Sequence, residues 1–92
     1  MSKTRAHFFL SGRVQGVCFR SESQKKARSL GVKGWVRNLQ DGRVEVVVEG
    51  EESKVKKFVE WAEEGPDFSE IENTELYWEN FKKEFDGFQI KY

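Results

Sequence analysis

The sequence predicts an α+β fold in which two helices cover one face of an antiparallel sheet. Three observations carry this prediction. The 92 residues are enough for one hydrophobic core but not for two. Stretches with the two-residue period of a strand alternate with two stretches that have the spacing of a helix. Eight Phe, three Trp and two Tyr supply large buried areas, so one such domain needs no disulfide or metal to hold it together.

The charges of the chain are balanced. Charged residues make up 35% of the chain, and the number of Lys and Arg residues, 16, equals the number of Asp and Glu residues, 16. A general nucleic-acid-binding protein usually has a basic excess, so this class is disfavoured. One Cys cannot form an internal disulfide or a cysteine-based zinc site. The N-terminal apolar run is too short for a signal peptide or a membrane span. We therefore expect a cytoplasmic protein that contacts neither nucleic acid nor membranes.

The first strand is predicted over residues 5–11. Ala6, Phe8 and Leu10 alternate along it and therefore fall on one face, which we expect to be buried. A loop rich in glycine and valine follows at residues 12–20.

Residues 21–31 predict the first helix. Ser21 and Gln24 have the spacing of a capping box at its start. Ala27 and Leu30 give the helix an apolar side.

Residues 33–50 predict a β-hairpin. Asp41-Gly42 favours the positive φ angles of a tight turn. The second strand of the hairpin is predicted to be half-buried, because apolar and acidic side chains alternate along it: Val44, Val46 and Val48 against Glu45 and Glu49.

Residues 51–64 predict the second helix, which Gly65-Pro66 ends. Its apolar stripe has the spacing i, i+3, i+4 and i+7, in Val55, Phe58, Val59 and Ala62. Lys56 lies four residues from both Glu52 and Glu60, so ion pairs are expected on the solvent-exposed face of this helix.

The last third predicts two further strands. Residues 67–73 are polar and irregular, 74–81 alternate as a strand, 82–87 connect, and 88–92 close the sheet. The resulting order, βαββαβ plus a short extra strand, is typical of a split βαβ or ferredoxin-like sandwich. We expect one domain over residues 1–92. This fold hosts many unrelated functions, so the fold alone assigns none.

The loop GRVQGVCFR at residues 12–20 is suited to bind an anion. Backbone N–H groups between a strand and a helix N-terminus favour a negative charge. Gly12 and Gly16 permit close backbone approaches, and Arg20 adds a fork of donors that matches phosphate oxygens. Glu22 in the first helical turn counts against an anion. The alternative is an ordinary strand-to-helix connection with a solvated arginine.

The same loop, followed by GWVRNLQDGRVEVVVEG, resembles the acylphosphatase family. That family has a G-x-V-Q-G-V-x-F-R loop and a G-W-V-x-N strand. The matching positions are Gly12, Val14, Gln15, Gly16, Val17, Phe19 and Arg20, then Gly34, Trp35, Val36 and Asn38. Beyond residue 66 the likeness is one of strand rhythm alone.

The resemblance implies hydrolysis of an acyl phosphate to a carboxylate and inorganic phosphate. It implies that Arg20 clamps the phosphate and that Asn38 orients the attacking water. The backbone of five residues would cradle the phosphate: Gln15, Gly16, Val17, Cys18 and Phe19. No cofactor and no metal are implied, and we expect a monomer acting on small acyl phosphates such as acetyl, carbamoyl or glycolytic acyl phosphate.

Two other functions remain open from the sequence. A non-catalytic module of the same fold would bind a phosphate-bearing ligand or RNA with the same loop. A carboxyl-phosphate domain of a larger maturation enzyme would also carry these motifs, although the strand set in this short chain counts against it.

Several reactive or aromatic side chains have simpler interpretations. Cys18 lies two residues before Arg20, whereas a cysteine phosphatase needs about six, so a nucleophilic role is disfavoured. His7 is interpreted as a structural or surface histidine rather than a general base. Trp35, Trp61 and Trp78 lie on three different elements, which indicates separate packing roles.

Overall fold

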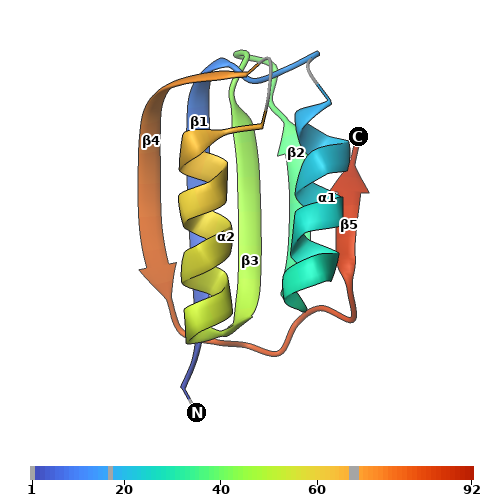
Figure 1. Cartoon of the computed structure of the whole chain (residues 1–92), viewed down its shortest axis with the longest axis vertical. Coiled ribbons are helices and arrows are strands. Elements are labelled where there is room, and N and C mark those ends of the chain that lie inside the picture. Colours follow the sequence, from blue (N-terminus) through green and yellow to red (C-terminus); the bar gives the residue numbers. More distant parts are fainter. Residues whose placement is uncertain (1, 17, 67–68) are drawn as a thin grey trace.

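The computed structural model describes residues 2–16, 18–66 and 69–92. They form one five-stranded sheet with both helices on the same face (Figure 1). The strands lie side by side in the order β4-β1-β3-β2-β5. The elements are β1 (Lys3–Arg13), α1 (Phe19–Leu30), β2 (Lys33–Asn38), β3 (Val44–Glu51), α2 (Glu52–Glu64), β4 (Glu70–Glu79) and β5 (Phe88–Lys91). The predicted α+β, ferredoxin-like sandwich is confirmed.

The sheet is mixed rather than antiparallel throughout, which corrects the prediction. β5 pairs with β2 in parallel, from Gly34 opposite Phe88 to Arg37 opposite Lys91. The reason is the connection at residues 80–87, which carries the chain from β4 at one edge to β5 at the other (Figure 1). As a result, the C-terminal strand lies beside α1.

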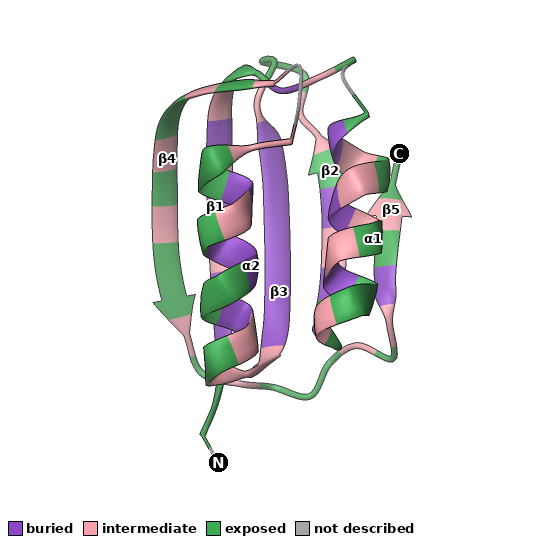
Figure 2. Cartoon of the chain, viewed as in Figure 1, coloured by how far each residue is buried: buried purple, intermediate pink, exposed green. Residues whose placement is uncertain are grey.

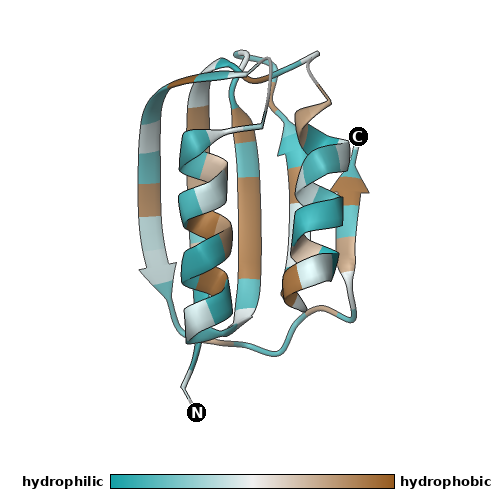
Figure 3. Cartoon of the chain, viewed as in Figure 1, coloured by the Kyte–Doolittle hydropathy of each residue, from teal (hydrophilic) through white to brown (hydrophobic). Residues whose placement is uncertain are grey.

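The core lies between the sheet and the helices. The predicted face of β1 is confirmed, because Ala6, Phe8 and Leu10 are fully buried. The stripe of α2 is also buried: Val55, Phe58, Val59 and Ala62. Figure 2 shows burial concentrated on β3 and on the helix faces that meet the sheet, and Figure 3 shows that β3 is hydrophobic over most but not all of this buried length.

The edge strand β4 begins at Glu70, four residues before the predicted start, so residues 70–73 are strand rather than irregular. Its pairing with β1 runs from Arg5 opposite Glu79 to Arg13 opposite Glu70, with a register shift between Ser11 and Gly12. Backbone pairing defines this segment, and an edge strand tolerates a polar sequence. Of the stretch predicted to be irregular, residues 67 and 68 lie outside the described residues.

The helix α1 begins two residues earlier than predicted, and the capping box does not form. Its N-cap is Cys18, with φ of 61°, and no side chain caps the helix. The Ser21 hydroxyl donates to the Cys18 carbonyl (3.1 Å), and the Gln24 amide donates to the Phe88 carbonyl (3.0 Å). Gln24 therefore joins α1 to β5. Within the described residues, neither helix is long and apolar enough to cross a membrane.

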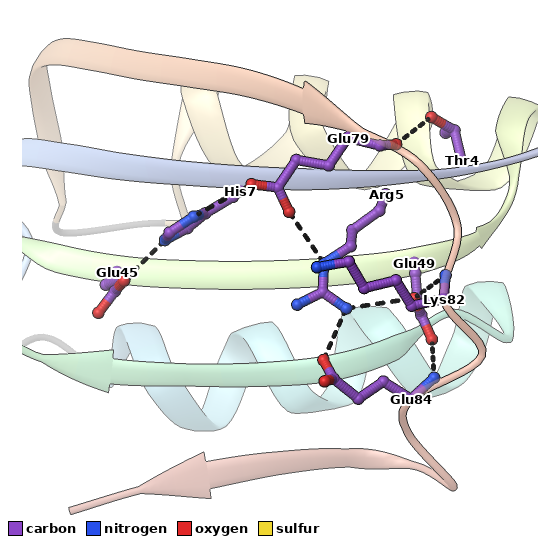
Figure 4. Close-up of polar contacts among 8 residues, drawn as sticks. All are labelled: Thr4, Arg5, His7, Glu45, Glu49, Glu79, Lys82 and Glu84. Carbon is purple, nitrogen blue, oxygen red and sulfur yellow. Dashed lines mark hydrogen bonds and ion pairs between the residues drawn. The ribbon is translucent and has the colours of Figure 1, made fainter.

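The sheet face away from the helices carries a buried ionic cluster, where the sequence predicted exposed glutamates. Glu45 and Glu49 are only 6% and 2% exposed. Arg5 contacts three carboxylates: Glu49 at 3.4 Å, Glu79 at 3.0 Å and Glu84 at 2.7 Å (Figure 4). Burial lowers the Arg5 pKa, but the hydrogen bond and attraction of Glu84 outweigh burial, with help from Glu79 and Glu49, so the pKa is raised overall.

Glu49 also accepts hydrogen bonds from the connection between β4 and β5. The backbone N–H groups of Lys82 and Glu84 donate to it at 3.2 and 2.6 Å. These bonds hold the connection against the open sheet face, so a buried carboxylate fixes the path that leads to β5.

His7 belongs to this face and is structural in position, as predicted. Its Nε2 lies 2.7 Å from Glu45, and the Nε of Arg37 donates to the same carboxylate at 2.6 Å. Burial raises the pKa of Glu45, but the hydrogen bonds from His7 and Arg37 outweigh burial and hold that pKa below its ordinary value.

Candidate active site

The loop that joins β1 to α1 lies at the end of the sheet where β2 and β5 also finish (Figure 1). We call residues 14–18 the β1–α1 loop. A hollow of about 160 Å³ lies between this loop, the first turn of α1 and the C-terminal strand. It is lined by Gly16, residues 18–21, Ile90 and Tyr92.

A larger hollow, of about 340 Å³, lies near the opposite end of the sheet. There Lys3, Lys33 and Lys83 face an equal number of carboxylates, from Glu49, Glu51 and Asp86. It offers a negatively charged ligand no net positive surroundings, whereas the smaller hollow has Arg20 on its wall and no Asp or Glu side chain among its lining residues.

Among the described residues around the smaller hollow, two have a left-handed backbone conformation. Gly16 has φ of 74° and Cys18 has φ of 61°. The first α-helical bond at this end runs from the Glu22 N–H to the Cys18 carbonyl (3.0 Å). The N–H groups of Phe19, Arg20 and Ser21 therefore have no carbonyl partner inside the helix, and such groups favour an anion.

Arg20 extends from the first turn of α1 to the C-terminal strand. Its Nη1 lies 3.5 Å from the Lys91 carbonyl oxygen, and its Cζ lies 4.8 Å from the centroid of the Tyr92 ring. Among the described residues no carboxylate lies within 4.0 Å of its guanidinium. Glu22, which counted against an anion here, lies 4.0 Å from the Lys25 ammonium, so its charge is partly balanced on the helix surface.

Asn38 is the last residue of β2 and pairs with Val44 across the hairpin. Its Oδ1 is buried, and no hydrogen-bond partner for it exists within the described residues. A buried acceptor without a partner costs about 1–3 kcal/mol, so such an atom is suited to bind a water molecule.

Gln15 connects the β1–α1 loop to the turn that follows Asn38. Its side-chain Nε2 donates to the carbonyl oxygens of Leu39 (2.8 Å) and Arg43 (2.9 Å). The loop and the end of β2 are therefore neighbours, although 24 residues separate Gln15 from Leu39.

The other predicted binding residues lie as follows. Phe19 is 2% exposed and its ring lies 5.9 Å from that of Trp61, so only its backbone is available to a ligand. Cys18 is a free, exposed cysteine. Val17 was predicted to contribute its backbone and lies outside the described residues. Gly16 and Arg20 line the hollow.

Sequence reasoning missed the contribution of the C-terminal strand. Ile90 and Tyr92 line the hollow, and the Lys91 carbonyl contacts Arg20. The alternation in FQIKY does place Ile90 and Tyr92 on one face, but nothing local in the sequence places that face beside α1.

No metal-binding cluster is found in the described parts of the chain, where three or more His, Cys, Asp or Glu side chains nowhere come together in a suitable arrangement.

Comparisons with known proteins agree with the fold and show the family. The family model for acylphosphatase matches residues 6–90. An acylphosphatase from Pelotomaculum thermopropionicum is 48% identical over 100% of both chains, and one from Roseiflexus sp. is 52% identical over 98% of this chain and 97% of its own. The crystal structure of acylphosphatase from Bacillus subtilis superposes with a TM-score of 0.91, at 35% identity, over 97% of this chain and 99% of that one. The chain belongs to the acylphosphatase family.

Proposed function

We propose that this chain hydrolyses acyl phosphates to a carboxylate and inorganic phosphate in the hollow beside the first turn of α1. The observation that carries the proposal is the pairing of Arg20, which has no carboxylate partner among the described residues, with the free N–H groups of the helix start around one small hollow. Membership of the acylphosphatase family supports the reaction type.

The phosphate would be held by backbone and guanidinium together. The backbone N–H groups of residues 15–19 would donate to its oxygens, and Arg20 would supply a charged fork of donors. In phosphoryl transfer, catalysis consists mostly of positioning and of stabilising charge on the equatorial oxygens. A loop and one arginine can supply both, so we propose that the reaction needs no metal.

Asn38 would hold the attacking water. Its Oδ1 can accept a hydrogen bond from water and keep that oxygen in line with the bond that breaks. The water oxygen forms a bond to phosphorus, the bond from phosphorus to the acyl oxygen breaks, and the electron pair leaves on the carboxylate. The water proton passes to a phosphate oxygen. A carboxylate is a weak base, so its departure needs no general acid.

The small hollow and the charged edge strand β4 support small substrates and a monomeric protein. Ile90 and Tyr92 line the hollow, and the acyl part would lie against them. The edge strand β4 exposes Glu70, Glu72 and Glu75, and charges on an edge strand oppose pairing with a second copy. Two relatives named acylphosphatase match over 97% or more of their own length, which favours an acylphosphatase over the carboxyl-phosphate domain of a larger maturation enzyme. We propose that this chain acts in the cytoplasm.

A turnover assay tests this proposal. The protein is incubated with a chromophoric acyl phosphate, with and without EDTA, and release of the carboxylate is followed. We expect catalytic turnover, inhibition by inorganic phosphate, and the same rate with the chelator. Loss of activity in EDTA that added metal restores would contradict metal independence. Phosphate binding without turnover would instead support the binding module.

A further inference from the structure

We propose that the Gln15 side chain is a positioning residue that holds the β1–α1 loop at a fixed separation from Asn38. The inference rests on the proposed function. It concerns a side chain, whereas the family motif implied only a backbone role for this residue.

Both N–H groups of the Gln15 amide are used on one small target. The Nε2 lies 2.8 Å from the Leu39 carbonyl oxygen and 2.9 Å from the Arg43 carbonyl oxygen. These two residues already face each other across the turn between β2 and β3, where the Leu39 N–H donates to the Arg43 carbonyl at 2.8 Å. The amide therefore binds a turn that is itself closed by a backbone bond.

The other end of this connection is equally fixed. Val14, next to Gln15, is 1% exposed and belongs to the hydrophobic core. Its N–H also donates to the Gly12 carbonyl at 3.1 Å. Gln15 thus joins two anchored points rather than two mobile loops.

These contacts lie directly beside the groups that the proposed reaction must align. Gly16, on the wall of the hollow, follows Gln15 in the chain, and Asn38 precedes Leu39. Asn38 has no partner for its Oδ1 among the described residues, so no hydrogen bond at that atom fixes the distance between the β1–α1 loop and Asn38. The Gln15 amide can fix it, because it ties the two backbones together.

The chemistry of the contacts suits an amide of this length. Both targets are carbonyl oxygens, which only accept hydrogen bonds, so the side chain must present two donors. A glutamate carboxylate would set acceptors against acceptors, a methionine would fill the space without donors, and an asparagine would be one methylene short. Misplacement by about 1 Å can cost on the order of 10²-fold in rate.

The test compares Gln15→Met and Gln15→Asn with the parent and with Gln40→Met. Gln40 lies in the same turn and is exposed, so its replacement controls for a change of side chain near the site. For each protein, kcat, KM and the inhibition constant of inorganic phosphate are measured with a chromophoric acyl phosphate, and the melting temperature is recorded.

We expect kcat to fall about 10- to 100-fold in Gln15→Met, while the phosphate inhibition constant changes by less than about threefold. Gln15→Asn should fall between this variant and the parent, and Gln40→Met should match the parent. If Gln15→Met does not fold at the assay temperature, Gln15→Asn decides, and a parent-like kcat there overturns the inference.

Two results separate this inference from the function on which it rests. A parent that turns over, with an unchanged kcat in folded Gln15→Met, overturns the positioning role and leaves the proposed function intact. A parent without turnover overturns both. If phosphate affinity falls as far as kcat does, Gln15 builds the anion site itself and the positioning role is likewise rejected.

Discussion

The Arg20 guanidinium lies over the ring of Tyr92, with its Cζ 4.8 Å from the ring centroid. Its other contact at this end is the Lys91 carbonyl oxygen, 3.5 Å from Nη1. Both partners are uncharged: the Lys91 carbonyl belongs to β5, and the Tyr92 ring follows that strand. They orient the guanidinium without neutralising it. Its charge, which no carboxylate of the described residues balances, remains available to an anion.

Replacing Arg20 with glutamine should nearly abolish turnover. Gln keeps hydrogen-bonding groups but loses the charge and the fork that match a phosphate, so we expect kcat/KM to fall by about 10³-fold or more. Phosphate affinity, measured by calorimetry, should fall as well. Arg28→Gln is the matched control, because Arg28 is an exposed arginine in the last turn of the same helix. Equal activity in the two variants would contradict the assignment of Arg20.

Replacing Asn38 with alanine should separate catalysis from binding. The variant loses the acceptor proposed to hold water, so we expect kcat to fall by about 10²-fold or more. Inorganic phosphate should still inhibit with nearly its original constant, since the loop and Arg20 are unchanged. Asn73→Ala, at an exposed position on β4, should behave as the parent does. A parallel loss of phosphate affinity in Asn38→Ala would place Asn38 among the phosphate ligands instead.

Local sequence patterns correctly predicted the elements that bury one face and expose the other to solvent. The period of two in Ala6, Phe8 and Leu10 and the stripe on α2 were both correct, because burial against the other layer dictates them. The start of β4 at Glu70 was missed, because backbone pairing with β1 makes that segment a strand. The burial of Glu45 and Glu49 was missed as well, because their partners come from distant segments.

The candidate site, too, could be predicted from the sequence only in part. Its contiguous part, the loop with Arg20, could be proposed from the residues of one stretch. Asn38, on another strand, could be proposed only through the family resemblance. The parts contributed by the C-terminal residues and by the turn after Asn38 could not be proposed. The parallel position of β5 brings Ile90 and Tyr92 to the hollow. The Gln15 amide binds two backbone carbonyl oxygens, and since every residue type carries such an oxygen, the sequence does not reveal this contact.

Gly34 in the G-W-V-x-N strand should not tolerate alanine. Its φ is 152°, and a Cβ there would run into the carbonyl group of Val47 on the neighbouring strand. Because the obstacle is backbone in the middle of the sheet, we expect Gly34→Ala to lower the free energy of unfolding by more than about 2 kcal/mol.

The control for this change is Gly87→Ala. Gly87 accepts the Gly34 N–H at 2.9 Å, yet a Cβ added to it would meet no atom within 4 Å. Its effect should stay within about 0.5 kcal/mol in urea unfolding. Similar losses in the two variants would show that the close approach of Val47 does not limit this position.

Glu45 should make stability depend on acid pH. Its folded pKa lies below its ordinary value, because the hydrogen bonds from His7 and Arg37 outweigh the effect of burial. A carboxylate with a lowered folded pKa adds stability at pH values above its unfolded pKa of about 4.3, and that stability is lost as the pH falls through the folded pKa.

Glu45→Gln removes the charge at every pH. We therefore expect the variant to be less stable than the parent by about 1–3 kcal/mol at pH 7. The difference should shrink as the parent is acidified below pH ~4. Urea unfolding of both proteins between pH 7 and pH 2.5 measures this difference. Glu63→Gln, at an exposed position on α2, should leave the pH profile of the parent unchanged. A difference for Glu45→Gln that stays constant down to pH 2.5 would mean that the ionised carboxylate is not what stabilises this face of the sheet.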